Sequence, residues 1–594
     1  MCGIIGFNKN NEKIMKDLLK EIKSRGPDQE GIEIFKNLTF GFRRLSIQDL
    51  SENGSQPMFD KKKKFCIIFN GEIFNFKELR TKLEKKGYKF KSKTDSEVIL
   101  YSYIEYGEDC LKYFNGQFSF CIYDIKKKEL FIARDRLGIR PLYYYKNKND
   151  FIFASELKVI LKSENKKFEL DKEQINHFFH FGFPDVEKTI FKKIKKLLPG
   201  HFLKYDLSKN KKKIKKYWDL KNNIKKKISF SRAKEIIDEK INKSIDYRII
   251  SDRPVGAFLS GGLDSSLIVA LMSKRIEKLH TFSVTFNNQK YDESKFAKIV
   301  SKKFKTIHHE LEFNSDDVKR LIKKTSEIYD EPFADPTSIP SYLISKYAKK
   351  KVDVCLSGAG ADELFFGYKR YHHFKILEKY QRLPQIFKTT ISNILSLSKN
   401  MKIMKINSIL SEKTLENKYS TLFTSSYGPG LKYNKKKYFH FKKNNDPTYF
   451  DLKEYLPSNL LYKEDLAGMA SSLETRFPYL DHKFVEFVFS LNNKIKSKNN
   501  NVKYLLKEVA LNYLPREIVY RKKKSFSVPY EEYFRNELKE FTEKQLKEFT
   551  TLKIFNEKII TLIWEEHLNK KVNHSEFLLR IIVFNLWHKK WIQK

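Results

Sequence analysis

The chain has 594 residues, 41% of them hydrophobic, and its 117 basic and 73 acidic residues give a formal net charge of +44. This length exceeds what a single hydrophobic core supports, so we expect at least two domains. The sequence contains no apolar run of about eighteen residues, which excludes a transmembrane helix.

The excess of positive charge is typical of proteins that bind nucleic acid or an anionic membrane surface. The lysines, however, are spread along the chain in short runs such as 61–64 and 211–213, and asparagine, isoleucine and phenylalanine are frequent as well. We therefore expect no specific nucleic-acid partner. The residues after CGIIGF turn polar at once, so no secretory signal is expected, and we predict a cytoplasmic protein.

Cysteine usage gives the first indication of chemistry. The five cysteines are scattered without CxxC spacing, which favours reduced thiols over a zinc site: Cys2, Cys66, Cys110, Cys121 and Cys355. If Met1 is removed, Cys2 carries both a thiol and a free α-amino group. That amine titrates at about 7.7–8.0 in model peptides, so part of it is neutral near physiological pH and can accept the thiol proton. Cys2 is a candidate nucleophile with its own base.

The first two hundred residues or so predict an α+β layered domain. Short apolar or alternating runs predict strands at 64–69, 117–123, 129–133 and 151–154, and helices at 76–86 and 96–106. A lysine-rich stretch with little core-forming pattern follows. We therefore place a first domain at 2–207, a linker at 208–228 and a second domain at 229–594.

The second domain begins with a predicted helix and continues with alternating strands and helices. The helix spans 231–248, and strands are predicted at 255–259, 279–286, 306–313 and 352–356. This alternation predicts parallel βαβ units in a doubly wound sheet. From about 367 onward the pattern is mostly helical.

The first of these strands is followed by Ser260-Gly261-Gly262-Leu263-Asp264-Ser265-Ser266 and then by an apolar helix. Glycines let the backbone approach a phosphate, hydroxyls donate hydrogen bonds, and the helix dipole favours negative charge. The Lys of a Walker A loop is absent. Asp264 adds a carboxylate suited to a magnesium ion that bridges phosphates.

A second loop, at 356–368, directly follows the strand at 352–356 and contains Asp362 and Glu363. Loops at the carboxyl ends of neighbouring parallel strands converge on one crevice. Asp264 and Asp362 would therefore both face a triphosphate and hold magnesium. An acidic pair also suits a helix N-terminus, so the role of Glu363 stays open.

Further motifs follow one another in a characteristic order. They are Arg25-Gly26-Pro27-Asp28, Arg44-Leu45-Ser46-Ile47, Asn70-Gly71-Glu72, Thr94-Asp95-Ser96-Glu97 and the segment 134–143. With Cys2 and SGGLDSS, the pyrophosphate-loop motif of N-type ATP pyrophosphatases, they make the chain resemble the glutamine-dependent asparagine synthetase family over nearly its whole length. The resemblance implies an N-terminal nucleophile domain, a four-layer αββα sandwich with class II glutamine amidotransferase activity. An α/β ATP pyrophosphatase domain with a parallel sheet and a helical C-terminal part would follow.

The resemblance also implies roles for particular residues. Cys2 would be the nucleophile, with the Asn70 side chain and the Gly71 N–H as the oxyanion hole. Glutamine would be bound by Arg44, Ile47, Glu72 and Asp95. ATP would be bound by Leu259, Ser260, Gly261, Gly262, Asp264, Ser265, Ser266, Val284, Ser357, Gly358 and Lys523, with Asp264 and Asp362 as Mg²⁺ ligands. Lys523 lies in RKKKSFSVP, which resembles a family segment that steadies the triphosphate, whereas the segment 472–481 (SLETRFPYLD) resembles a scaffold segment.

The implied activity is ATP-dependent amidation of aspartate with ammonia from glutamine, through an acyl-adenylate, with release of AMP and pyrophosphate. Ammonia would pass through an interdomain tunnel. The partners would be glutamine, ATP and a carboxylate, and the resemblance allows a homodimer.

The loop at 356–368 departs from the family pattern at two positions. Ala359 stands where characterised family members have a glutamate thought to act on the acceptor or on ammonia, and alanine cannot transfer a proton. Phe366 stands where glycine is common, which would reshape the loop. An alternative is therefore the same chemistry on another carboxylate, such as a surface-polysaccharide precursor. A third hypothesis, a nucleic-acid-associated or scaffold protein that has lost catalysis, conflicts with the intact Cys2, Arg44, Asn70, Asp95, Asp264 and Asp362.

Overall fold

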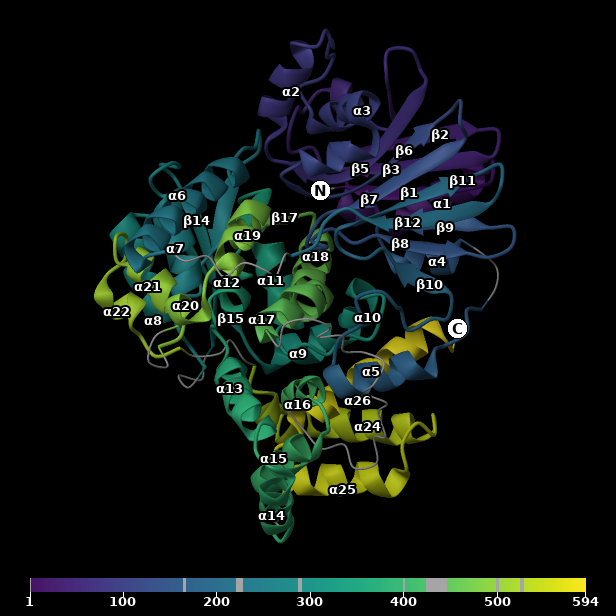
Figure 1. Cartoon of the computed structure of the whole chain (residues 1–594). Helices are drawn as coiled ribbons and strands as arrows, with labels where there is room; N and C mark the ends of the chain where they lie inside the picture. Colours follow the sequence, from purple (N-terminus) through teal and green to yellow (C-terminus); the bar gives the residue numbers. More distant parts are fainter. Residues whose placement is uncertain are drawn as a thin grey trace.

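The computed structural model describes residues 2–163, 167–220, 228–286, 291–398, 401–423, 446–497, 501–523 and 528–593. Figure 1 shows two strand-rich parts side by side and a helical part beneath them that contains the C-terminal helices. The first part is built on antiparallel sheets and the second on a parallel sheet.

Two six-stranded antiparallel sheets form the first domain. One has the order β10 (Ile194–Lys196), β8 (Tyr143–Lys146), β9 (Phe151–Ala154), β1 (Gly3–Phe7), β3 (Leu38–Arg44) and β2 (Gln29–Phe35). The other has the order β12 (Lys211–Lys216), β11 (His201–Asp206), β7 (Glu129–Arg134), β6 (Gly116–Asp124), β5 (Phe65–Ile73) and β4 (Met58–Phe59).

These sheets stack face to face, with helices on their outer faces. Inward-pointing side chains, including Ile4, Phe40, Ile68, Cys121 and Phe153, form one buried cluster between them. The helices α1 (Glu12–Glu21) and α4 (Leu157–Lys162) cover the first sheet, and α2 (Phe76–Glu84) and α3 (Asp95–Tyr106) cover the second. Because strand side chains alternate between faces, each sheet packs on both sides. The predicted αββα sandwich is confirmed.

The prediction of a linker over 208–228 is wrong at 211–216. These residues form β12, which pairs with β11 from His201↔Lys216 to Asp206↔Lys211. Five of the six side chains of β12 are lysines and most are exposed. Backbone hydrogen bonds hold this edge strand, and its lysines discourage further pairing. The apolar alternation expected of a strand is therefore absent from β12. Another part of the predicted linker, 221–227, lies outside the described residues.

The second domain contains a five-stranded parallel sheet. Its order is β15 (Ile307–Phe313), β14 (His280–Phe286), β13 (Val255–Phe258), β16 (Val354–Leu356) and β17 (Glu474–Arg476). The four strands predicted from the sequence are confirmed, whereas β17 lies in a segment we expected to be scaffold. The helices α6 (Phe230–Arg248), α7 (Leu263–Met272), α8 (Ser294–Phe304) and α11 (Ser338–Ala348) pack around the sheet.

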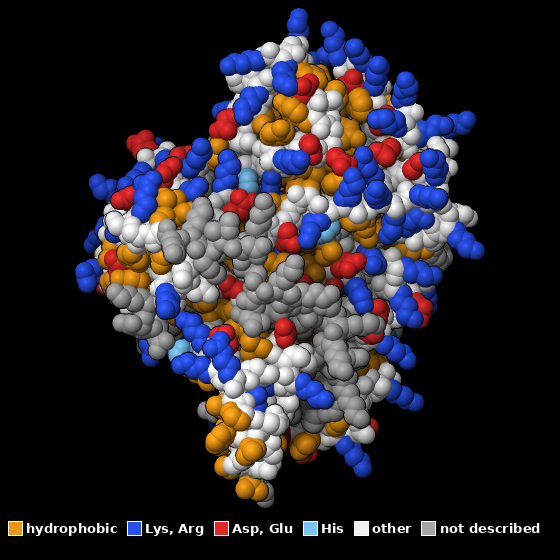
Figure 2. Space-filling view, viewed as in Figure 1, with side chains coloured by type: hydrophobic (Ala, Val, Ile, Leu, Met, Phe, Trp, Pro, Cys, Tyr) orange, Lys and Arg blue, Asp and Glu red, His pale blue; other side chains and the backbone are white. Residues whose placement is uncertain are grey.

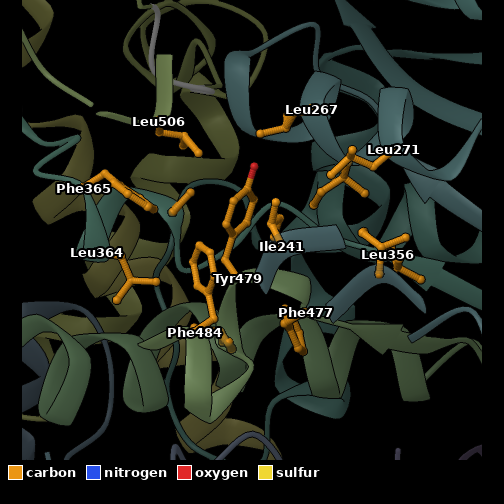
Figure 3. Close-up of a cluster of buried hydrophobic side chains, with 14 of the residues drawn as sticks. Ile241, Leu267, Leu271, Leu356, Leu364, Phe365, Phe477, Tyr479, Phe484 and Leu506 are labelled. Atoms are coloured by element: carbon orange, nitrogen blue, oxygen red, sulfur yellow. The ribbon is translucent and has the colours of Figure 1, made fainter. Parts of the chain in front are cut away.

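A buried cluster beneath the 260–266 loop fixes the position of that loop. Figure 3 shows Tyr479 among Ile241, Leu267 and Phe484, with its hydroxyl pointing away from the Phe484 ring. The Tyr479 hydroxyl donates to the Asp264 carbonyl oxygen at 3.1 Å. A buried tyrosine usually finds a hydrogen-bond partner for its hydroxyl. Here that partner is the backbone of the loop, so core packing and loop geometry are tied together.

The remaining helices complete the structure. They are α5 (Lys172–Phe181), α9 (Ser315–Leu321), α10 (Thr325–Ile328), α12 (Ala361–Leu364), α13 (Lys369–Gln381), α14 (Gln385–Ser396), α15 (Met401–Ser411), α16 (Leu415–Leu422), α17 (Pro447–Phe450), a π-helix (Asp451–Leu460), α18 (Leu461–Met469), α19 (His482–Ser490), α20 (Asn493–Lys496), α21 (Tyr504–Ala510), α22 (Arg516–Val519), α23 (Tyr530–Arg535), α24 (Lys539–Thr550), α25 (Glu557–Leu568) and α26 (Ser575–Trp591). The predicted helical C-terminal part is confirmed. In it α26 contacts α24 and α5, with Trp587 fully buried.

The surface agrees with the distributed charge of the sequence. Figure 2 shows lysine and arginine side chains scattered over the upper part and both sides of the visible face, mixed with acidic ones. Apolar side chains are exposed at the end of the molecule formed by α14, where Ile386, Phe387, Ile394 and Leu397 face solvent. Among the described residues, no helix is both long enough and apolar enough to cross a bilayer.

Candidate functional site

Cys2 lies directly before β1, beside the middle of β5. Its backbone nitrogen donates to Asn70 Oδ1 at 3.1 Å, and its thiol donates to the Leu45 carbonyl oxygen at 4.0 Å. The side chain is buried, and this burial raises the pKa of the Cys2 thiol. A thiol in such a place needs a neighbouring base to become a nucleophile. The structure thus brings Cys2 and Asn70 together, while Met1 lies outside the described residues.

The backbone around Asn70 and Gly71 is closely constrained. Gly71 has φ +146°, and a Cβ there would lie 2.1 Å from the Gln117 carbonyl oxygen. Only glycine fits this approach of β5 to β6. The Asn70 amide nitrogen donates to Ser155 Oγ at 3.5 Å, and Ser155 Oγ also accepts from the Ile4 N–H. This network orients the Asn70 side chain beside Cys2.

The other predicted glutamine-binding residues come from the end of β3, the loop after it, β5 and the start of α3. The Arg44 guanidinium donates to the Ser51 carbonyl oxygen and to Gln29 Oε1, both at 2.8 Å. The Ile47 carbonyl oxygen accepts from an N–H of the second domain. Asp95 accepts from the Ile73 N–H at 2.8 Å, and burial raises the pKa of Asp95 to about 7.

Glu72 joins this site to the second domain. Its carboxylate accepts from Gln48 Nε2 at 2.6 Å and lies 3.3 Å from the Arg476 guanidinium of β17. Burial raises the pKa of Glu72 well above its ordinary value, with the charge of Glu474 acting in the same direction. Arg476 also donates to Glu474 at 2.7 Å. Sequence reasoning missed Arg476 because it treated 472–481 as scaffold.

Arg25 makes a second connection between the domains. Its Nε donates to the Cys2 carbonyl oxygen at 3.1 Å, and its Nη1 lies 2.9 Å from Asp465 of α18 and 3.1 Å from Glu156. The guanidinium is completely buried. The sequence indicated only that Arg25 begins a family-like turn. The structure places its side chain directly behind the nucleophile.

The strand β17 forms a wall between two sites. Arg476 pairs with Glu72 of the first domain, and the charge of Glu474 acts on Cys2 and Glu72. The Thr475 carbonyl oxygen accepts from Arg140 at 3.2 Å and from Gln117 at 3.4 Å. Thr475 also lines a cavity in the second domain. Because side chains alternate along a strand, three consecutive residues can serve both sides.

That cavity has a volume of about 340 Å³ and lies at the carboxyl ends of β13, β14 and β16. This is the position at which open parallel sheets bind ligands. Eight residues predicted for ATP or metal line it: Leu259, Ser260, Asp264, Ser265, Val284, Ser357, Gly358 and Asp362. Gly261, Gly262 and Ser266 do not line the cavity, and Lys523 contacts it through Asp362.

The 260–266 loop has the geometry of an anion cradle. Ser260 Oγ accepts from the Gly262 N–H at 3.3 Å and lies 3.0 Å from Ser265 Oγ. Gly261 has φ +67°, and a Cβ there would lie 2.6 Å from the Ala297 nitrogen. Gly262 is the N-cap of α7, and Asp264 and Ser265 of the first helical turn line the cavity, so the N-terminus of this helix lies at the cavity wall.

Two lysines neutralise the carboxylates at the cavity. Lys503 Nζ lies 2.5 Å from Asp264 and 2.7 Å from Asp362, and Lys523 also pairs with Asp362. Although burial acts in the opposite direction, Lys503 and Lys523 hold the pKa of Asp362 well below its ordinary range. Lys503 was missed because nothing marked it among so many lysines.

The same carboxylates fit a magnesium ion shared with phosphate. Asp264 Oδ1 is buried and has no hydrogen-bond partner among the described residues, and Asp362 shares Lys503 with Asp264. Mg²⁺ is commonly held by one or two carboxylates together with substrate phosphates. Within the described residues, no group of three or more His, Cys, Asp or Glu side chains is suited to hold a metal by itself.

The departures from the family pattern lie at this cavity. Ala359 is part of its wall, as is Glu464 of α18, whose carboxylate accepts from Ser357 Oγ at 3.1 Å. Phe366 has φ +58° and is buried against Tyr371, away from the cavity lining. Sequence reasoning did not single out Glu464.

Comparison with known proteins agrees with this two-site arrangement. The family model described as asparagine synthase matches residues 237–589, and the glutamine amidotransferase domain model matches 1–218. The chain belongs to the asparagine synthase family. It is similar to asparagine synthetase [glutamine-hydrolyzing] 1 of Bacillus subtilis (strain 168), with 32% identity over 100% of this chain and 97% of the relative.

Two further members of the asparagine synthase family are similar to this chain. A putative asparagine synthetase [glutamine-hydrolyzing] 2 of Methanocaldococcus jannaschii is 42% identical over 66% of this chain and 81% of its own length. The asparagine synthetase [glutamine-hydrolyzing] of Gallus gallus is 28% identical over 89% and 84%. Membership of the asparagine synthase family assigns to this chain a glutamine-dependent, ATP-driven amidation, with ATP as a substrate.

Proposed function

We propose that the chain converts aspartate to asparagine, through an acyl-adenylate and with release of AMP and pyrophosphate. The observation that carries this proposal is β17, whose residues contact the Cys2 site on one side and line the cavity on the other. An enzyme that makes ammonia at one site and uses it at another needs such adjacency. The two half-reactions can then be assigned to named residues.

The first half-reaction takes place at Cys2. Its α-amino group, freed by removal of Met1, accepts the thiol proton, and the thiolate attacks the amide carbon of glutamine. The Asn70 side chain and the Gly71 N–H stabilise the oxyanion, an effect worth about 2.7–4 kcal/mol per donor in hydrolases. Arg44, Ile47, Glu72 and Asp95 bind glutamine. Ammonia leaves, and water then releases glutamate from the thioester.

The second half-reaction takes place in the cavity. The acceptor carboxylate attacks the α-phosphate of ATP, which forms the acyl-adenylate and expels pyrophosphate. The helix N-terminus after the 260–266 loop and the lysines Lys503 and Lys523 beside Asp264 and Asp362 support a role of this region in binding the phosphates. Mg²⁺, held by Asp264 and Asp362, would neutralise charge on the leaving pyrophosphate. Ammonia that passes β17 displaces AMP and forms the amide.

Product analysis tests this proposal. Purified protein with ATP, magnesium, glutamine and aspartate should give asparagine, AMP and pyrophosphate in equal amounts, measured by mass spectrometry. Glutamate without asparagine or AMP would reject aspartate as the acceptor but leave the glutaminase half intact. A cytoplasmic location and a homodimer belong to the same proposal, and sedimentation of the purified protein checks the dimer.

A second candidate is the same chemistry on another carboxylate, such as a surface-polysaccharide precursor. Two observations favour it: Ala359 in the cavity wall, and the lack of an unpaired cation among the described lining residues. Lys463, the lysine in that lining, pairs with Asp335 at 3.3 Å. An α-carboxylate such as that of aspartate is usually held by a free cation. ATP–pyrophosphate exchange with a panel of carboxylates separates the two candidates.

A further inference from the structure

The amide-forming step has a chemical requirement that the proposed machinery does not meet. When ammonia attacks the acyl carbon, a C–N bond forms, the C–O bond to AMP breaks, and nitrogen must lose a proton. A positioned base accelerates such a proton transfer by about 100- to 10,000-fold. The loop residue Ala359, which lies in the cavity wall, has no group that can accept a proton.

One carboxylate of the described cavity lining forms no salt bridge, although the nearby charge of Lys463 acts on it. Of the acidic residues in the described lining, Asp264 and Asp362 are paired with lysines, and Glu293 pairs with Arg521 at 2.6 Å. Glu464 forms no salt bridge with any residue that the structure describes. Its Oε1 accepts from Ser357 Oγ at 3.1 Å, and its Oε2 is shielded from solvent without a hydrogen-bond partner. A shielded polar atom of this kind calls for a ligand or a function.

Glu464 also lies on the side of the cavity that faces the glutaminase site. The next residue of α18, Asp465, pairs with Arg25, and Arg25 donates to the Cys2 carbonyl oxygen. Ammonia that enters from the Cys2 site would therefore arrive at the α18 side of the cavity.

The other side of Glu464 leads to the phosphate cradle. Ser357, which donates to Glu464, precedes Gly358, and a Cβ on Gly358 would lie 3.2 Å from both Asp264 and the Ser265 nitrogen. Glu464 is thus one hydrogen bond away from a loop that packs against the 260–266 segment. The acyl carbon, joined to the α-phosphate, would lie between them.

We propose that Glu464 is the catalytic base of amide formation, which accepts the proton lost by ammonia as it attacks the acyl-adenylate. This inference rests on the proposed function and adds a residue to it. Glu464 supplies, from α18, the proton acceptor that the 356–368 loop lacks at Ala359. The acceptor carboxylate and ATP need no base in the preceding step, because a carboxylate is already a nucleophile.

The surroundings of Glu464 suit this task. Burial raises the pKa of its carboxyl group, which makes the carboxylate a stronger proton acceptor. The charged or titratable groups that interact with it are Lys463, Asp335, Cys355 and Tyr329. Lys463 is itself paired with Asp335, so its charge is largely balanced at this position.

Glu464→Gln tests the inference, because it keeps the shape and removes the base. Three activities are measured with the carboxylate that supports exchange in the wild type: glutamate release from glutamine, carboxylate-dependent ATP–pyrophosphate exchange, and amide formation from ammonium. We expect the first two to stay within about threefold of wild type and amide formation to fall about 100- to 10,000-fold. In the wild type, the rate of amide formation should rise with pH on the acidic side as Glu464 loses its proton. This rise should be absent from the pH–rate profile of Glu464→Gln.

Glu454→Gln is the matched control. Glu454 is a half-buried glutamate in the preceding π-helix, its pKa is raised by burial to about 8, and it does not line the cavity. We expect it to leave all three activities unchanged. Amide formation by Glu464→Gln within threefold of wild type would overturn the inference, as would an equal loss of exchange, which would show a role in acceptor binding. Wild-type protein that shows no exchange with any carboxylate would instead overturn the proposed function, and this inference with it.

Discussion

The Arg25 guanidinium lies 2.9 Å from the Asp465 carboxylate, and both side chains are almost completely buried at the boundary of the two domains. Asp465 also pairs with Arg140 at 3.2 Å. One carboxylate thus compensates two buried guanidinium groups, and one of these holds the carbonyl oxygen of the proposed nucleophile. The interface between the domains is therefore part of the glutaminase site itself.

Because of this pair, we predict that Asp465→Asn lowers both the stability of the protein and its rate of glutamine hydrolysis. Asp465→Asn leaves Arg140 without its buried carboxylate and leaves Arg25 with Glu156 alone. Removing one partner from a buried ion pair costs about 3–5 kcal/mol. The free energy of unfolding, from denaturant titration, should fall by about this amount, and glutamine turnover should fall with it. Asp17→Asn, which removes only the exposed pair with Lys20, should change neither. Equal stability of Asp465→Asn and wild type would contradict the importance of the pair.

Cys2→Ala should separate the two half-reactions. Without the thiol, glutamine-dependent amidation should be lost, while amidation with ammonium salts should continue because the cavity is a separate site. Asp264→Asn should show the reverse pattern, with glutaminase retained and amidation lost. Steady-state assays of both reactions on the same preparations check this, and a folded Cys2→Ala protein inactive with ammonium would contradict the scheme.

Asp95→Asn should stabilise the protein while impairing glutamine binding. An aspartate in an unfolded chain ionises near pH 3.9, whereas the pKa of buried Asp95 is raised to about 7. The folded state therefore holds a proton that the unfolded state loses, and raising the pH from about 4 to 7 weakens the fold. At pH 8 the variant should gain up to about 4 kcal/mol.

Thermal melts at pH 4 and pH 8 check the Asp95 prediction. The difference in melting temperature should be large at pH 8 and nearly absent at pH 4. The KM for glutamine should rise, because the amide cannot pair with the substrate ammonium. A variant that is less stable than wild type at pH 8 would contradict the prediction that burial of the Asp95 carboxyl lowers the free energy of unfolding at this pH.

Lys503→Met should remove nucleotide chemistry and spare the glutaminase. Lys503 lies between Asp264 and Asp362, so its loss leaves excess negative charge where the triphosphate binds. We expect ATP–pyrophosphate exchange to fall by about 100- to 1,000-fold, the effect of removing one preorganised donor. Lys507→Met is the control, since Lys507 bonds Asn501 and neither aspartate. Exchange at the wild-type rate would show that Lys523 alone suffices.

Gly71→Ala should abolish glutaminase activity through a steric clash. The added Cβ would lie 2.1 Å from the Gln117 carbonyl oxygen, so β5 and β6 must separate next to Asn70. We expect a loss of about 2 kcal/mol or more in the free energy of unfolding. Gly87→Ala also places alanine at positive φ, at +93°, but meets nothing within 4 Å. Comparing both variants by denaturant titration isolates the clash from the backbone strain.

The sequence by itself determined the two-site design. The strand and helix patterns predicted a layered α+β domain followed by a parallel sheet. Local motifs singled out Cys2, Asn70 and the 260–266 loop, and in the structure Cys2 lies beside Asn70 and the loop joins β13 to α7. Each of these features is determined by neighbouring residues within one short segment, such as a strand, a glycine turn and the first turn of a helix. The parallel sheet then brought Asp264 and Asp362 together, as the convergence of strand ends requires.

Only the tertiary structure decided the partners of the charged side chains. Lys503, Asp465, Arg476 and Glu464 meet residues that are distant in the sequence, and in a chain with 117 basic residues no local pattern marks which one will be buried. The strand β12 was missed for a related reason. Five of its six residues are lysines, so the sequence shows no apolar alternation where backbone pairing with β11 forms a strand. Motifs specify backbone geometry locally, whereas the pairing of charges across an interface follows from which surfaces the fold brings into contact.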